Sequence, residues 1–218
     1  MKFGSGHPLA YPLAVTIGAL AVCFAWAPFG DPDQVAALAA VALGIIGYSG
    51  YRIGVARGVF AFWPAATART VGVSRIRQQY RLVSRSWLEI SGTGRPRWLP
   101  VYFDPRLMTC TEGRAEITDR TVYLAGHRLY PSGRIRATEP PGRLIDNPSR
   151  PDPDAPVHTA TRLRRRLLFD AQPTVAAPFA ALLWIYLDGG DLLTFFAATT
   201  VAASAALWLS AIQGSDPS

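Results

Sequence analysis

Charge is distributed so unevenly along this chain that it restricts the possible folds more than any other feature does. All 21 arginines and nine of the 15 acidic residues lie between positions 52 and 166, which gives this middle part a net charge of about +12. On either side the chain is apolar, and Lys2 is the only basic residue there. Long uncharged segments beside a charged region are typical of membrane helices joined to a water-exposed domain.

Four apolar segments are candidates for membrane helices. They are residues 9–29, 34–51, 167–187 and 192–212. At a rise of 1.5 Å per residue, about 20 residues reach ~30 Å, the thickness of the hydrocarbon core. The third segment is the weakest, because its strictly apolar part, 174–187, reaches only ~21 Å unless the helix begins at Leu167. The acidic turns 30–33 and 188–191 join the segments into two helical hairpins.

An alternative for the first segment is a cleaved signal sequence. Ala25-Trp26-Ala27 resembles a signal-peptidase site, and Leu20-Ala21-Val22-Cys23 resembles a lipoprotein box. Against both stand the length of the apolar run, the single basic residue Lys2 before it, and Pro28 directly after the first site. We therefore expect this segment to remain as a helix.

The charges that flank the four segments predict their orientation. Both turns carry two aspartates and no basic residue, whereas Arg52, Arg57 and residues 162–166 flank the middle part. Basic residues stay on the cytoplasmic side of a membrane protein. We therefore expect a multi-pass protein of the cell inner (plasma) membrane, with the middle domain and both termini in the cytoplasm.

The middle part contains short runs with partial apolar–polar alternation, bounded by Gly, Pro and Asp, as expected of strands. The predicted strands are residues 80–90, 98–103, 107–111, 115–118, 120–125, 128–130 and 134–136, the last two forming a hairpin. Their spacing predicts a small β-barrel or sandwich. Residues 139–156 hold six prolines, a composition typical of a linker.

The predicted fold class is therefore membrane α plus soluble β, in which four transmembrane helices form two hairpins around an inserted cytoplasmic β domain. The predicted divisions are an N-terminal hairpin at 1–64, an Arg-rich β domain at 65–140, a Pro-rich linker at 141–162 and a C-terminal hairpin at 163–218.

Small residues recur at helical spacing in the apolar segments. They are Ala36, Ala40, Gly44, Gly50, Gly54, Gly58, Ala198, Ala202 and Ala206. Helices in lipid gain contacts mainly where small residues let their backbones approach closely. Some of these faces must pair the chain's own helices, and the remainder favours an integral membrane partner, such as a permease or transporter subunit, or a second copy.

The arginines allow three interpretations. They hold the middle part inside and contact anionic lipid headgroups, they dock an acidic partner, or they bind nucleic acid with aromatic residues such as Tyr102. Because the arginines are spread over the domain, nucleic acid is the least favoured partner. The residues expected to contact anionic lipid or a partner are Arg52, Arg57, Arg95, Arg97, Arg134, Arg136, Arg164, Arg165 and Arg166.

Signals of chemistry are absent from the sequence. The first, second and fourth apolar segments contain no ionisable residue of the kind that carriers place at membrane depth. The sequence has no Walker-type loop, GxGxxG, GxSxG or HExxH motif, and Cys23 and Cys110 stand apart from any metal-ligand spacing. We expect no catalytic residue, no metal and no cofactor, and hence no enzyme.

The whole chain resembles small actinobacterial inner-membrane proteins, some of which are accessory subunits of mycobacterial Mce-type lipid-import complexes. The resemblance rests on the Ala-rich hairpins, the near-exclusive use of Arg, and stretches such as 86–89 (Ser-Trp-Leu-Glu) and 98–103 (Trp-Leu-Pro-Val-Tyr-Phe). It implies a non-enzymatic subunit that packs on permease helices in a lipid importer. The alternative is a membrane-anchored scaffold or sensor whose basic β domain binds anionic lipid or nucleic acid.

Overall fold

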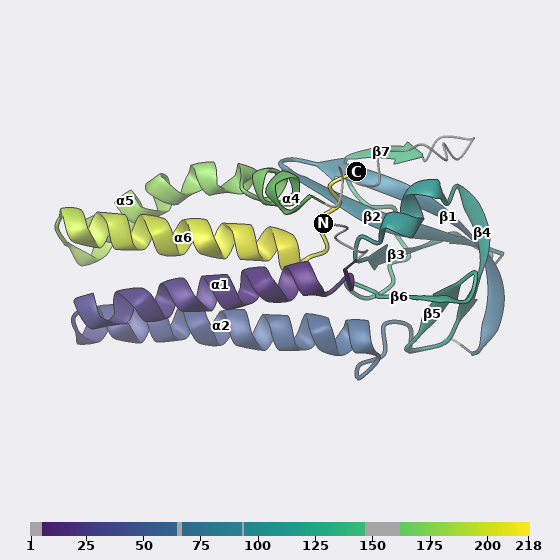
Figure 1. Cartoon of the computed structure of the whole chain (residues 1–218), viewed down its shortest axis with the longest axis horizontal. Coiled ribbons are helices and arrows are strands. Elements are labelled where there is room, and N and C mark those ends of the chain that lie inside the picture. The colour runs from purple at the N-terminus through teal and green to yellow at the C-terminus, as the bar shows by residue number, and fades with distance from the viewer. Residues whose placement is uncertain (1–5, 65–66, 93, 147–161) are drawn as a thin grey trace.

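The computed structural model describes residues 6–64, 67–92, 94–146 and 162–218. A helical bundle forms one end of the molecule and a curled β-sheet forms the other (Figure 1). The chain enters the sheet from the first hairpin and returns to the bundle through the second. The hairpin turns lie at the end of the bundle that is distant from the sheet (Figure 1).

The first hairpin consists of α1 (Ala10–Trp26), the 3-10 turn η1 (Ala27–Phe29) and α2 (Pro32–Arg57). Asp31 caps α2 by accepting a 2.8 Å hydrogen bond from the Gln34 N–H, and Pro32 supplies a first-turn residue that needs no acceptor. The two predicted helices are confirmed. The helical pattern was expected to persist past the apolar segment, to about Trp63-Pro64, and α2 ends at Arg57.

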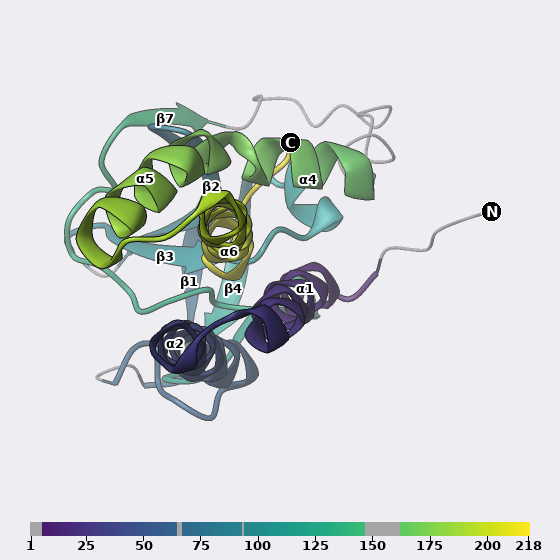
Figure 2. The same cartoon turned by 90° about the vertical axis from the view of Figure 1, so that its left-hand side faces the viewer.

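The second hairpin consists of α4 (Leu163–Asp170), the 3-10 turn η3 (Gln172–Ala176), α5 (Ala177–Asp188) and α6 (Leu192–Ile212). The third apolar segment is thus interrupted, because Pro173 and Pro178 lack an N–H and restrict the preceding turn. Figure 2, which looks along the bundle, shows α4 lying across its end. Together η3 and α5 reach ~28 Å, close to the ~30 Å of a hydrocarbon core.

Four helical stretches among the described residues are long and apolar enough to cross a membrane. They are Ala10–Phe29, Pro32–Arg57, Leu163–Asp188 and Leu192–Ile212. In the bundle α6 lies between α1 and α5, and α2 packs mainly on α1 (Figure 2). Many large apolar side chains face outward, among them Phe24 and Tyr186 at 81% and 84% exposed. Such a surface suits hydrocarbon better than water.

The sheet contains seven strands among the described residues. They are β1 (Arg69–Tyr80), β2 (Val83–Ser91), β3 (Arg97–Val101), β4 (Glu112–Ile117), β5 (Val122–Leu124), β6 (His127–Leu129) and β7 (Arg143–Asp146). Their order is β3-β2-β1-β4-β5-β6, with β7 paired to β1, and each described pair is antiparallel. The sheet curls into a half-barrel.

The segment that follows α2 fills the concave face of this sheet. Phe62 and Trp63 are 0% and 5% exposed, and they pack with Val55 of α2 against the inward residues of the strands. Their N–H groups both donate to the carbonyl oxygen of Asp119, and the Ile135 N–H donates to the Phe62 carbonyl. The first hairpin is therefore anchored inside the β domain.

The structure corrects several predictions for the sheet. The central strand β1 was not predicted. The strand expected at 107–111 is replaced by the 3-10 turn η2 (Pro105–Thr109), where the Asp104 carboxylate accepts a hydrogen bond from the Arg106 N–H. The expected hairpin of 128–130 with 134–136 does not form, because β6 pairs with β5 instead. Within the predicted linker, 143–146 forms β7, and 147–161 lies outside the described residues.

Candidate functional site

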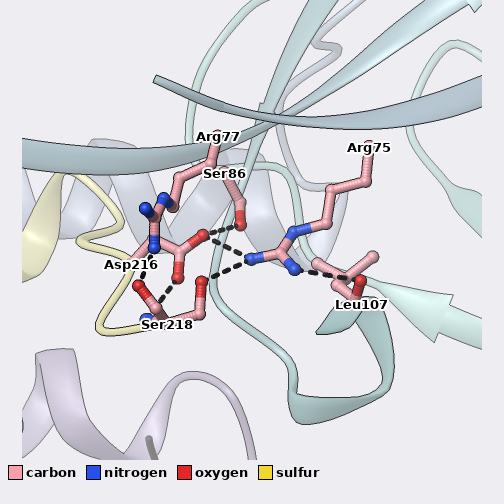
Figure 3. Close-up of polar contacts among 6 residues, drawn as sticks. All are labelled: Arg75, Arg77, Ser86, Leu107, Asp216 and Ser218. Atoms are coloured by element: carbon pink, nitrogen blue, oxygen red, sulfur yellow. Dashed lines mark hydrogen bonds and ion pairs between the residues drawn. The ribbon is translucent and has the colours of Figure 1, made fainter. Parts of the chain in front are cut away.

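A buried ion pair joins the sheet to residues 213–218, which follow α6 and are called the C-terminal segment below. Nη2 of Arg75, in β1, lies 2.6 Å from Oδ2 of Asp216, and the two side chains are 2% and 0% exposed. Ser86 Oγ donates to the same carboxylate oxygen at 2.6 Å, and the Ser218 N–H donates to Oδ1 at 2.9 Å. Arg75 also donates to Ser218 Oγ at 2.9 Å (Figure 3).

Further hydrogen bonds complete this cluster. Arg75 donates to the Leu107 carbonyl at 3.1 Å, and Arg77 donates to the main-chain oxygen of Ser218 (Figure 3). Burial by itself raises the pKa of Asp216, but the Arg75 guanidinium and the hydrogen bonds from Ser86 and Ser218 outweigh it and hold the pKa below its ordinary value. Asp216 is therefore ionised and balances the buried charge of Arg75.

The backbone of the C-terminal segment lies along β2. Ser215 and Arg85 form an isolated antiparallel bridge, and the Asp216 N–H donates to the Ser84 carbonyl at 2.9 Å. On this side of β2 the pairing with β3 stops at Ser86. The segment thus occupies the position beside β2 that β3 leaves free, and it brings the end of α6 onto the sheet.

A second set of polar contacts connects the helices to the same region. Asp170, at the end of α4, accepts a 2.6 Å hydrogen bond from the Tyr11 hydroxyl of α1 and a 2.8 Å bond from Ser215 Oγ. The hydroxyl of Tyr102, after β3, donates to the Ile212 carbonyl at the end of α6 at 2.8 Å. These contacts link α1 to α4, α4 to the C-terminal segment, and the end of α6 to the β domain, so buried polar bonds join the bundle and the sheet.

The arginines expected to contact lipid or a partner differ in exposure. Arg57, Arg95, Arg134, Arg136 and Arg164 are exposed, and Arg52, Arg97, Arg165 and Arg166 are half-buried. The half-buried ones lie over aromatic rings, as Arg166 does at 4.0 Å from the centre of the Tyr11 ring. Arg85 is a further arginine that no sequence pattern indicated, and the charges of Arg52 and Arg136 act on it.

The predicted small-residue positions also separate into groups. Ala36, Ala40, Gly44 and Gly50 are exposed on α2. Gly54 is buried, because a Cβ atom there would lie 2.6 Å from the Phe60 ring, and Gly58 ends α2 with a φ of 80°. Gly54 therefore packs against the chain's own Phe60, and its contact with a partner helix stays a prediction. On α6, Ala206 is half-buried.

Ala198 and Ala202 line a groove between the two hairpins, at the end distant from the sheet. Its volume is about 550 Å³. The groove is lined by α2, α5 and α6, together with Trp26 of α1 and the residues of the two hairpin turns. Trp26 and Trp184 line it together with six alanines from α2, α5 and α6. A groove of this kind can accept an apolar chain or another helix.

The sequence contained no pattern that indicated the Arg75–Asp216 pair, because its members are 141 positions apart. Among the described residues, no group of three His, Cys, Asp or Glu side chains is placed to hold a metal ion. No family model, curated protein or solved structure matches the chain. The resemblance to Mce-type accessory subunits stays a prediction, and a function has to be argued from the chain's own residues.

Proposed function

We propose that this chain is a non-enzymatic accessory subunit of an inner-membrane complex, which binds a transmembrane helix of an integral membrane partner in the groove between its hairpins. The observation that supports this most is the groove itself. Its lining on α2 extends from Gln34 to Val41 and on α6 from Leu193 to Ala205. From Leu193 to Ala205 the helix rises ~18 Å, about three turns of a docked helix.

The composition of the groove favours a helix over a lipid tail. Ala37, Ala198 and Ala202 are small, so a second backbone can approach closely and gain dispersion contacts that a mobile acyl chain does not provide. Ala36 and Gly44 are also exposed on α2, outside the groove lining, and they add small-residue surface for the partner.

The firm attachment of the bundle to the sheet suits an accessory role. Hydrogen bonds join α1 to α4, α4 to the C-terminal segment and the end of α6 to the β domain. A partner held in the bundle is therefore held at a fixed position relative to the domain. The domain can then orient or contact parts of the complex outside the bilayer. A lipid importer of the Mce type is the complex that the sequence resemblance implies.

Co-purification in mild detergent tests the proposal. We expect the tagged protein to bring down one integral membrane protein in a fixed ratio, and mass spectrometry shows whether that protein is a permease. The variant Ala202→Leu fills the groove and should lose the companion. The matched control is Ala39→Leu, an exposed position on the opposite face of α2, which should keep it.

Two results would contradict the proposal. One is a wild-type protein that purifies without any companion. The other is a companion retained by Ala202→Leu as fully as by Ala39→Leu, since the groove would then have no part in binding.

A further inference from the structure

Three arginines gather where α2 meets the β domain. Arg52 is in the last two turns of α2, with Nη1 next to the loop at Gly133, and Arg85 is in β2. Arg136 follows β6 and exchanges two backbone hydrogen bonds with Trp98 of β3. Two of the arginines are linked through Tyr102 and the end of α6: the Tyr102 side chain is hydrogen-bonded to Arg52 and donates to the Ile212 carbonyl, and the next residue, Gln213, accepts from Arg85. The charges of Arg52 and Arg136 both act on Arg85.

No carboxylate of the described residues balances this cluster. The ion pairs among the described residues are Arg75 with Asp216 and Arg120 with Asp119. Neither pair includes an arginine of this cluster. The Nε atoms of Arg52 and Arg85 are buried without a hydrogen-bond acceptor from those residues. Like charges that share a half-buried site repel each other in a medium that screens poorly.

The polar neighbours of the cluster are neutral. Arg85 donates to the Gln213 side-chain oxygen, and Arg52 lies 5.5 Å from the centre of the Tyr48 ring. Burial raises the pKa of Tyr102 to about 12 despite the nearby Arg52, so its hydroxyl stays protonated. Burial, and then the charges of Arg52 and Arg136, lower the pKa of Arg85, although an arginine remains protonated at any physiological pH.

The position of the cluster indicates what could balance it. Arg52 is one turn after Tyr48 in a candidate membrane helix, near the end that adjoins the β domain (Figure 1). Tyr and Arg at the end of a membrane helix lie at the level of lipid headgroups. Arg136 is exposed and Arg52 and Arg85 are half-buried, so the cluster is open on one side.

We infer that Arg52, Arg85 and Arg136 together bind a phosphate group at the membrane surface, supplied by an anionic phospholipid. Guanidinium groups match phosphate oxygens with paired, charge-assisted hydrogen bonds. One phosphate can accept from several arginines at once and removes their mutual repulsion. This inference is independent of the proposed helix-binding groove, which lies at the other end of the bundle.

The test compares thermal unfolding of the full-length protein in lipid nanodiscs. The three conditions are phosphatidylcholine alone, phosphatidylcholine mixed with phosphatidylglycerol, and phosphatidylcholine alone with inorganic phosphate in the buffer. We expect phosphatidylglycerol to raise the unfolding midpoint of the wild type by several degrees. An equal rise with inorganic phosphate would also support the phosphate site and would assign it to a soluble source.

Variants separate a specific site from general attraction to anionic lipid. Arg85→Gln, and independently the exposed Arg136→Gln, should lose most of the rise with phosphatidylglycerol. In phosphatidylcholine alone Arg85→Gln should unfold no earlier than the wild type, because it removes a repelling charge. The control Arg114→Gln deletes an exposed arginine of β4 and should keep the full rise. The inference is overturned if neither lipid nor phosphate shifts the wild type, or if Arg136→Gln keeps the rise as fully as Arg114→Gln does.

Discussion

At the scale of single residues, Arg75 and Asp216 show how the two parts of the molecule are joined. A charge buried alone is costly, and a buried pair is stable only when further hydrogen bonds satisfy both partners. Here the carboxylate accepts from Ser86 and Ser218, and the guanidinium donates to Leu107 as well. The pair therefore fixes the position of the C-terminal segment on the sheet.

We predict that Asp216→Asn destabilises the protein by ~3–5 kcal/mol, because it removes the carboxylate charge from a buried ion pair. The matched control is Asp119→Asn, which breaks the exposed pair with Arg120 and should cost no more than about 1 kcal/mol. Denaturant unfolding in mild detergent, followed by tryptophan fluorescence, measures both. Equal stability of the two variants at neutral pH would contradict this role for the pair.

The same pair predicts how stability depends on pH. The pKa of Asp216 is lower in the folded protein than its ordinary value of 3.8. Its contribution is therefore fully present above that ordinary value and is lost as the pH falls through the lower folded-state value. The difference in unfolding free energy between the wild type and Asp216→Asn should stay constant near neutral pH. It should narrow as the pH falls below the ordinary pKa of Asp216.

At the scale of elements, the sequence predicted the helices better than the strands. Three of the four apolar segments are recognisable because length and lack of charge alone decide whether a helix can span a bilayer, and α6 has its predicted bounds. The strand β1 escaped notice because Arg75, Arg77 and Gln78 interrupt its apolar alternation. Two of these side chains, Arg75 and Gln78, are nevertheless buried, since bonds to distant residues satisfy them.

The site was less predictable than the fold for the same reason. Which arginines face one another depends on the strand register and on where the C-terminal segment lies, and neither can be read from local spacing. Arg85 was missed for this reason, although Arg52 and Arg136 were singled out. The groove likewise depends on how the two hairpins splay, whereas Ala198 and Ala202 by themselves indicated only a close helix contact.

The hairpin turns and the β domain should lie on opposite sides of the membrane, with the domain inside. The test uses a variant lacking the native cysteines and carrying one new cysteine, either Asp33→Cys in the first turn or Arg134→Cys in the β domain, both at exposed positions. An impermeant thiol reagent should label the first in intact cells and the second only after permeabilisation. Labelling of Arg134→Cys in intact cells would show that the β domain lies outside the cell, which contradicts the predicted orientation.

At the scale of the whole molecule, two candidate surfaces lie at opposite ends of one helical bundle. The groove is near the hairpin turns, and the arginine cluster is where the bundle meets the sheet. The buried polar contacts of Asp170, Tyr102 and Asp216 hold the bundle and the sheet as one unit. A partner helix in the groove would therefore fix the position of the subunit in the complex, and a lipid phosphate at the cluster would fix its depth in the membrane.

Site-specific photo-cross-linking in native membranes tests the central claim most directly. A photoreactive amino acid is placed at Val41, which lines the groove, or at Ile46, which is exposed on the other face of α2. We predict that position 41 cross-links to one integral membrane protein and that position 46 does not. Capture of lipid alone at position 41, or the same protein captured equally from both positions, would contradict the account.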